Sequence, residues 1–131
     1  MSEPRNAVEN HHPGVMIEII AKDQQAMKTF YSKVFGWRYH QSGTNGFAYV
    51  HFGERKLPLL AGIGQCVRNT PGFEPGHYFY LLVDDLEATI EAAVQAGGKE
   101  FVPPTEADGY HFAMIRDPEG NPIGLIAPFT D

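Results

Sequence analysis

One pattern occurs twice in this 131-residue chain. A strand-like segment at residues 16–23 leads into a helical pattern that ends at Gly36, and a matching segment at residues 78–85 leads into a second one that ends at Gly97. The offset of 62 residues between the two segments is too long for a solenoid unit, and two copies are too few for an array. We therefore expect two similar βαβββ modules that bury their apolar faces against each other, with a ligand cleft between them.

The repeat predicts both the fold class and the division of the chain. The expected class is α+β, with the modules forming one cupped, mixed and mostly antiparallel sheet and both helices on its convex side. We expect a flexible arm at residues 1–13 and a single domain at residues 14–128. Within the domain we expect module one at residues 14–64, a linker with two prolines and two glycines at 65–76, and module two at 77–128.

The net charge, the hydropathy and the cysteine content of the chain argue against several classes of protein. The formal net charge of −6 argues against nucleic acid as a partner, because phosphate binding needs a basic face. No apolar run approaches the ~18 residues of a membrane helix, and the polar start has no apolar region like that of a signal peptide. The single cysteine, Cys66, cannot form an internal disulfide. We expect a cytoplasmic protein with neither a nucleic-acid nor a membrane partner.

Both predicted helices carry capping signals. Asp23 suits the N-cap of a helix that runs through Phe35, and Gly36 suits the left-handed residue that often ends a helix. In the second half, Asp84 and Glu87 have the spacing of a capping box. The apolar stripes are Met27, Phe30, Tyr31 and Val34 in the first helix and Leu86, Ile90, Ala93 and Val94 in the second.

Side chains two residues apart in a strand share a face, which assigns faces to the first strand of each module. One face carries Met16, Glu18, Ile20, Tyr78, Tyr80 and Leu82, and the other carries Ile17, Ile19, His77, Phe79 and Leu81. Ile17, Ile19, Phe79 and Leu81 suit packing beneath the helices. Glu18, Tyr78 and Tyr80 then face the cleft, and His77 does not unless the register shifts by one residue.

Several motifs in this order carry a family resemblance. They are Asp23, residues 30–37 (FYSKVFGW), 83–89 (VDDLEAT), 96–99 (AGGK) and 117–121 (DPEGN), and the resemblance covers most of residues 15–128. In this order and spacing the chain resembles the vicinal oxygen chelate superfamily. That superfamily contains glyoxalase I, extradiol dioxygenases, fosfomycin-modifying enzymes and bleomycin-resistance proteins. Trp37 and Glu18 make the chain most similar to the glyoxalase-related subgroup.

The resemblance implies a metal held by up to four residues of the cupped sheet, from the first and last strands of each module. The positions that match those ligands are Met16 and Tyr78 in the first strands, with Gly124 and either Ala61 or Gly62 in the last strands. A thioether, a phenol and glycine are unsuited to a hard or borderline divalent ion. We therefore expect a degenerate metal site and no cofactor. The resemblance also implies a homodimer.

Glu18 is the sharpest candidate for a functional side chain. Burying a carboxylate without a partner is costly, so it needs a hydrogen-bond donor, a cation or solvent. It would then act as a general base with a raised pKa, or hold an amine or hydroxyl of a ligand. The structural alternative is a glutamate that is satisfied by a tyrosine hydroxyl.

The other candidates are aromatic or histidine side chains on neighbouring strands. Met16, Tyr49, Tyr78, Tyr80 and Phe112 are candidate ligand-binding residues of the cleft, although core packing explains the aromatic ones equally well. His51, two residues after Tyr49, is a candidate acid or base. Its structural alternative is a half-exposed histidine in a strand.

Three functional hypotheses follow. The first is a protein of this fold that binds a small organic ligand without a metal. The alternative is a lyase, isomerase or dioxygenase-related enzyme that uses Glu18 and a nearby histidine or tyrosine as acid–base groups. The third is a non-catalytic accessory domain of a larger assembly. The sequence identifies neither the ligand nor the reaction.

Overall fold

The computed structural model describes residues 12–52 and 60–128, so nearly all of the expected arm and part of module one lie outside the described residues. The first half consists of β1 (Gly14–Ala21), α1 (Gln24–Phe35), β2 (His40–Gln41), β3 (Ala48–His51) and β4 (Leu60–Gln65). The second half consists of β5 (Gly76–Leu82), α2 (Leu86–Gln95), β6 (Lys99–Ala107), β7 (Tyr110–Arg116) and β8 (Pro122–Ile126).

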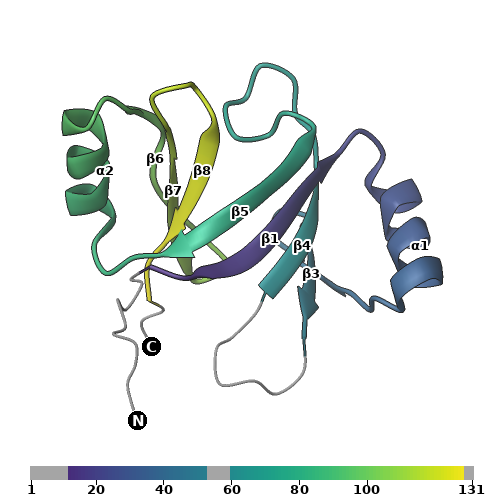
Figure 1. The fold of residues 1–131 in the computed structure, drawn as a ribbon. Coiled ribbons are helices and arrows are strands. Elements are labelled where there is room, and N and C mark those ends of the chain that lie inside the picture. The colour runs from purple at the N-terminus through teal and green to yellow at the C-terminus, as the bar shows by residue number, and fades with distance from the viewer. Residues whose placement is uncertain (1–11, 53–59, 129–131) are drawn as a thin grey trace, which may run out of the picture.

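All the strands belong to one cupped sheet in the order β2-β3-β4-β1-β5-β8-β7-β6 (Figure 1). The pairs β1–β4 and β5–β8 are parallel, and the remaining pairs are antiparallel. This arrangement confirms the predicted α+β class with a mixed, mostly antiparallel sheet. The two halves meet where β1 pairs with β5.

The sequence repeat is reflected in the register of the sheet, because equivalent residues of the two halves pair with equivalent partners. Glu18 lies opposite Gly62 of β4, and Tyr80 lies opposite Gly124 of β8. Each member of the second pair stands 62 residues after its counterpart in the first. Across the central pairing, Met16 lies opposite Tyr80 and Glu18 opposite Tyr78. The same face of both halves therefore lines the inside of the cup.

The caps of α1 are the ones that the sequence predicts. The Asp23 side chain accepts a hydrogen bond from the backbone N–H of Ala26 at 3.1 Å, and Gly36 is left-handed with φ 73°. For α2 the prediction of Asp84 was wrong by one residue, because Asp85 is the N-cap and accepts from the N–H of Ala88 at 3.0 Å. The backbone N–H of Val83 bonds to the carbonyl of Ile126, so the chain is still held to the sheet at Val83, one residue after the end of β5.

Each helix packs on strands of its own half, α1 on β1 and β4 and α2 on β6 and β7 (Figure 1). Around α1, buried Ile19, Ala21 and Ile63 pack with Met27, Tyr31 and Trp37, and around α2, Leu86 and Ile90 pack with Val83, Ala113 and Leu125. Among the described residues, no helix is long and apolar enough to cross a membrane.

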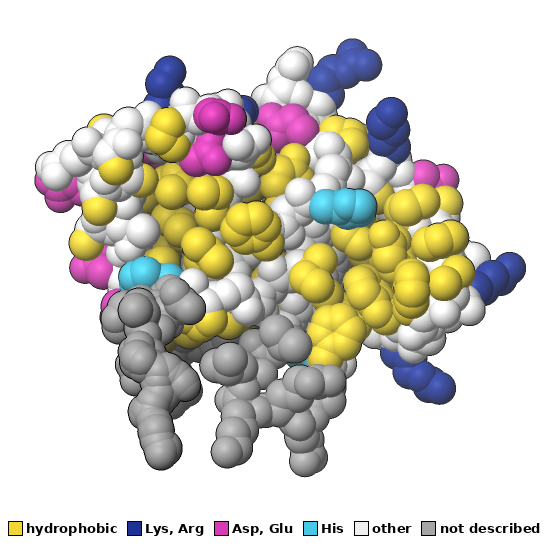
Figure 2. Space-filling view, viewed as in Figure 1, with side chains coloured by type: hydrophobic (Ala, Val, Ile, Leu, Met, Phe, Trp, Pro, Cys, Tyr) yellow, Lys and Arg dark blue, Asp and Glu magenta, His cyan; other side chains and the backbone are white. Residues whose placement is uncertain are grey.

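Neither helix covers the middle of the outer face in the described part of the chain. Ile17 and Phe79 lie opposite each other across β1 and β5 and are 51% and 53% exposed. The prediction that these two side chains pack beneath a helix was wrong, because the helices lie toward the two ends of the sheet, whereas Ile19 does pack near α1. Figure 2 shows hydrophobic side chains at the surface of both halves.

Two aromatic rings lie directly on glycines inside the cup. A Cβ atom at Gly62 would overlap the ring of Phe47, and one at Gly124 would overlap the ring of Tyr80. Both glycines are therefore required by the close approach of a ring, not by an unusual backbone angle. Their lack of a side chain lets the rings of Phe47 and Tyr80 lie close against the backbone of the sheet.

We expect Gly124→Ala to lower the free energy of unfolding by about 1–3 kcal/mol, since the added methyl group forces the Tyr80 ring to move. Chemical denaturation would measure the change. Gly43→Ala is the matched control, because nothing lies within 4 Å of a Cβ atom at that position. An unchanged unfolding midpoint for Gly124→Ala would show that the ring does not rest on this glycine.

Candidate functional site

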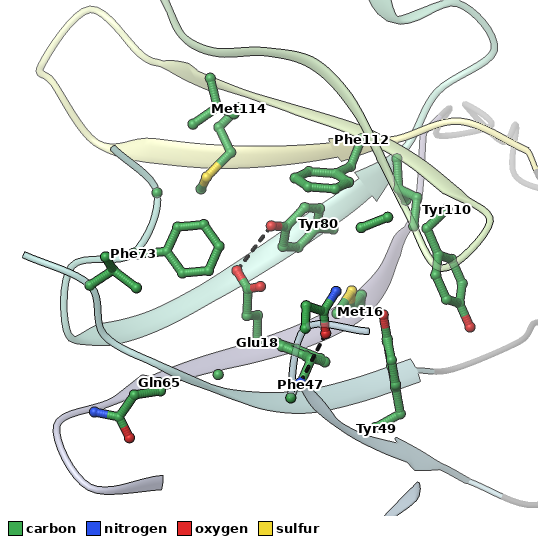
Figure 3. Close-up of a pocket in the computed structure, with 18 of the residues that line it drawn as sticks. Met16, Glu18, Phe47, Tyr49, Gln65, Phe73, Tyr80, Tyr110, Phe112 and Met114 are labelled. Atoms are coloured by element: carbon green, nitrogen blue, oxygen red, sulfur yellow. Dashed lines mark hydrogen bonds between the residues drawn. The ribbon is translucent and has the colours of Figure 1, made fainter. Parts of the chain in front are cut away.

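A cavity of about 280 Å³ lies inside the cup, between the two halves (Figure 3). Both halves contribute to its wall, and most of the wall is apolar or aromatic. The principal lining residues are Met16, Phe47, Tyr49, Leu60, Phe73, Tyr80, Tyr110, Phe112, Met114 and Ile126. A concave and mainly apolar cavity with a few polar groups is the usual form of a small-molecule site.

Glu18 is the one carboxyl group in the lining that the structure describes. It is 8% exposed, and its Oε1 atom accepts a hydrogen bond from the Tyr80 hydroxyl at 2.9 Å. Its Oε2 atom has no hydrogen-bond partner among the described residues. Figure 3 shows the carboxyl group among the lining side chains, close to Tyr80 and Phe73.

Burial governs the protonation of this pair. It raises the pKa of Glu18 from 4.5 to about 7, against the opposing effect of the Tyr80 hydrogen bond. Burial also raises the pKa of Tyr80 above its usual range, and the adjacent Glu18 raises it further. At neutral pH, Tyr80 is therefore a hydrogen-bond donor, and Glu18 is close to the point where it gains or loses a proton.

The amide side chains of the lining are engaged within the protein. The Gln24 Nε2 atom donates to the carbonyls of Gly46 and Ile63 at 3.0 and 2.6 Å. The Gln65 side chain accepts from the N–H of Gln24 at 3.0 Å and donates to the carbonyl of Lys22 at 2.7 Å. These bonds tie the end of β4 to the start of α1 and fix one wall of the cavity.

A second polar cluster joins the two halves beside the cavity. Asp108, exposed at the β6–β7 turn, accepts hydrogen bonds from the Tyr49 hydroxyl at 2.8 Å and from the Asn45 amide at 3.2 Å. The hydrogen bond from Tyr49 is the main cause that lowers the pKa of Asp108. The rings of Tyr49 and Tyr110 stack with centroids 5.5 Å apart. Sequence analysis missed this cluster, since Asp108 and Gly109 indicate only a turn.

The structure brings most of the candidate residues together. Met16, Glu18, Tyr49, Tyr80 and Phe112 all line the cavity. Phe47 and Phe73 also line it, and no local pattern in the sequence distinguishes them from ordinary core residues.

Two candidates lie outside the lining of the cavity. Tyr78 is buried beside it, but its hydroxyl donates to the backbone carbonyl of Glu74 at 2.7 Å. His51 is exposed at the end of β3, with its ring centroid 6.5 Å from that of Tyr49.

The residues at the positions of the implied metal ligands do not fit a divalent ion. Met16 and Tyr78 offer a thioether and a phenol, and Gly62 and Gly124 offer no side chain. The rings of Phe47 and Tyr80 occupy the space that side chains at these glycines would need. Within residues 12–52 and 60–128, no three His, Cys, Asp or Glu side chains are grouped so that they could hold a metal.

Comparison with known proteins agrees with the architecture. The family model described as Glyoxalase/Bleomycin resistance protein/Dioxygenase superfamily matches residues 14–125. The putative glyoxylase CFP32 of Mycobacterium tuberculosis is 30% identical over 112 residues, which are 83% of this chain and 43% of that protein. A glyoxylase-like domain-containing protein of Didymella fabae is 33% identical over 123 residues, covering 80% of this chain and 85% of that protein.

Solved structures share the fold at low sequence identity. A methylmalonyl-CoA epimerase of Streptomyces coelicolor, in complex with 2-nitronate-propionyl-CoA, has a TM-score of 0.66 at 14% identity and covers 90% of this chain and 98% of its own. A superfamily member from Vibrio splendidus 12B01 has a TM-score of 0.56 at 15% identity, covering 89% of this chain and 99% of its own.

The chain thus spans less than half the length of the mycobacterial relative, although it covers most of the fungal one. The family match over residues 14–125, the two relatives at 30% and 33% identity and the paired β-α-β-β-β halves agree with one another. This chain belongs to the glyoxalase/bleomycin resistance protein/dioxygenase superfamily.

Proposed function

We propose that this protein binds a small organic ligand in the cavity between its halves, at a site that has lost the metal ligands of its superfamily. The observation that carries the proposal is the cavity of about 280 Å³, lined by aromatic and apolar side chains around one buried acid. An apolar ligand would gain binding free energy by removing this surface from water, and Glu18 would orient it.

The size and the wall of the cavity support binding of a compact molecule. An engineered apolar cavity of about 150 Å³ takes up benzene, so 280 Å³ suits a ligand with about two fused rings. The rings above Gly62 and Gly124 stand where metal-binding side chains would be needed. The site would therefore recognise shape and hydrogen bonding rather than offer coordination to a metal.

We expect the neutral dye N-phenyl-1-naphthylamine to bind with increased fluorescence, because the cavity wall is mostly apolar. Ala107→Phe would fill the cavity from the edge strand β6 and is expected to weaken dye binding about tenfold or more. The same substitution at an exposed position of α2, Ala88→Phe, is the control, because Ala88 does not line the cavity. Equal dye binding by all three proteins would contradict the assignment of the ligand to this cavity.

A second candidate function is acid–base catalysis of the lyase or isomerase kind, or a dioxygenase-related reaction. The observation that favours it is Glu18, whose pKa is raised to about 7 and whose carboxyl is held by the Tyr80 hydroxyl at 2.9 Å. A base with a pKa near the working pH can take a proton from a substrate and return it. Tyr80, rather than the more distant His51, would be its partner and would keep the carboxyl oriented.

The protonation of Glu18 has a measurable effect on stability. Its folded-state pKa of about 7 lies above the unfolded value of 4.5, so the folded state binds more protons between these values. The free energy of unfolding is then expected to fall as the pH rises from 4.5 to 7 and to level off above, by up to about 3 kcal/mol in total.

The measurement is chemical denaturation at a series of pH values, read as the difference between the wild-type protein and Glu18→Gln. Glutamine keeps an acceptor for the Tyr80 hydroxyl but cannot ionise, so the variant should lose this fall in stability. Glu91→Gln, on the exposed side of α2, is the matched control and should keep it. Parallel pH profiles for wild type and Glu18→Gln would mean that Glu18 ionises at an ordinary pH.

We also propose a homodimer that forms through the outer face of the sheet. Ile17 and Phe79 are about half exposed at its centre, and Phe30 and Val34 are equally exposed one turn apart on α1. An exposed apolar surface of this kind is typical of a contact with another protein. The formal charge of −6 also supports our expectation of a protein without a nucleic-acid partner, and we propose a cytoplasmic location for it.

Sedimentation equilibrium at micromolar concentration is expected to give twice the mass of the chain. Phe79→Ser should shift the equilibrium toward monomer, since it removes an apolar side chain from the proposed contact. Val67→Ser, an equally exposed residue on the cavity side, should leave the mass unchanged. A wild-type protein that sediments as a clean monomer would refute the dimer.

A further inference from the structure

The hydrogen-bonding side chains of the cavity lining differ in whether they already have a partner within the protein. The side-chain donors of Gln24, Asn45 and Gln65 already donate to protein acceptors. The hydroxyls of Tyr49 and Tyr80 donate to Asp108 and Glu18. Each of these five side chains therefore donates at least one hydrogen bond within the protein, whereas one carboxyl oxygen of Glu18 accepts none from the described residues.

That oxygen is the Oε2 atom of Glu18, which has no partner within the described part of the chain. It belongs to a side chain that is 8% exposed and that lies among aromatic rings (Figure 3). Because no buried side-chain polar atom lacks a partner among the described residues, this oxygen is accessible from the cavity. An accessible carboxyl oxygen in an apolar cavity favours a ligand group that can donate a hydrogen bond to it. A ligand that presents only acceptors would meet an acceptor here.

The charges around the cavity favour a positive ligand over a neutral one. Among the described lining residues there is no lysine, arginine or histidine, and Glu18 is the one acid. Asp108 adds a second carboxylate beside the lining residues Asn45, Tyr49 and Tyr110, and the chain as a whole carries a formal charge of −6. The negative faces of the tyrosine and phenylalanine rings also attract cations.

We propose that the cavity selects a protonated amine carried on an aromatic frame of about two rings, with its ammonium group donating to the Oε2 atom of Glu18. This inference rests on the proposed function and names the chemical class of its ligand. The apolar wall holds the rings of the ligand, and the buried carboxylate neutralises the cation. Anions such as acyl thioesters of coenzyme A meet no positive group in the described wall of this cavity.

Three probes of nearly the same shape test the choice of charge. They are 2-naphthylmethylamine, which is cationic at pH 7.5, 2-naphthylmethanol, which is neutral, and 2-naphthoate, which is anionic. Isothermal titration at pH 7.5 and low salt would measure their affinities for the whole chain. We expect the amine to bind about tenfold or more tightly than the alcohol, because a hydrogen bond between charged groups is stronger than a neutral one. We expect no measurable binding of 2-naphthoate.

Two variants connect this preference to Glu18. In Glu18→Gln the affinity for the amine should fall to that for the alcohol, while the alcohol should bind as it does to wild type. Glu91→Gln makes the same change of charge on an exposed side chain of α2, and it should keep the full preference for the amine. This control separates the local hydrogen bond from the overall charge of the chain.

Several outcomes would overturn the inference. It is refuted if the alcohol binds as tightly as the amine, or if the naphthoate binds most tightly. It is also refuted if Glu18→Gln keeps the preference for the amine. If none of the three probes binds but N-phenyl-1-naphthylamine still enters the cavity, the ligand class is wrong and the binding function stands. If that dye also fails to bind, both proposals fail.

Discussion

The antiparallel pairing of β1 with β5 is the contact on which the site depends. In the strand order of the described sheet, it is the place where the two halves meet. Its register sets Met16 opposite Tyr80, which brings the Tyr80 hydroxyl within 2.9 Å of Glu18 on the same face. A shift of one residue would turn the Glu18 side chain to the outer face, and the cavity would lose its acid.

A buried carboxyl constrains everything packed around it. No lysine, arginine or histidine faces Glu18 from the described lining of the cavity, so the Tyr80 hydroxyl alone compensates its burial. The result is a carboxyl group whose pKa is raised to about 7. Side chains long enough to reach a metal from Gly62 or Gly124 would displace the rings of Phe47 and Tyr80. The aromatic wall and a metal site at these positions therefore exclude each other.

The sequence predicts what depends on local period and capping, and it falls short where contacts join distant segments. The 62-residue repeat, the caps at Asp23 and Gly36 and the inward side of Glu18 all follow from spacing. Alternation assigns Phe79 to a face, but it does not show whether a helix covers that face. The bond from Tyr49 to Asp108 spans 59 residues and depends on where the β6–β7 hairpin folds over, which no local pattern records.

The asymmetry between the two halves is what gives the cavity its chemistry. The repeat places Glu18 and Tyr80 at equivalent positions on β1 and β5. Two glutamates there would repel each other when ionised, and two tyrosines would leave the cavity without an acid. One of each gives a donor and an acceptor joined by a single hydrogen bond, and the second carboxyl oxygen has no partner among the residues that the structure describes. The two similar halves together form the cavity, and the difference between them determines which hydrogen-bonding groups line it.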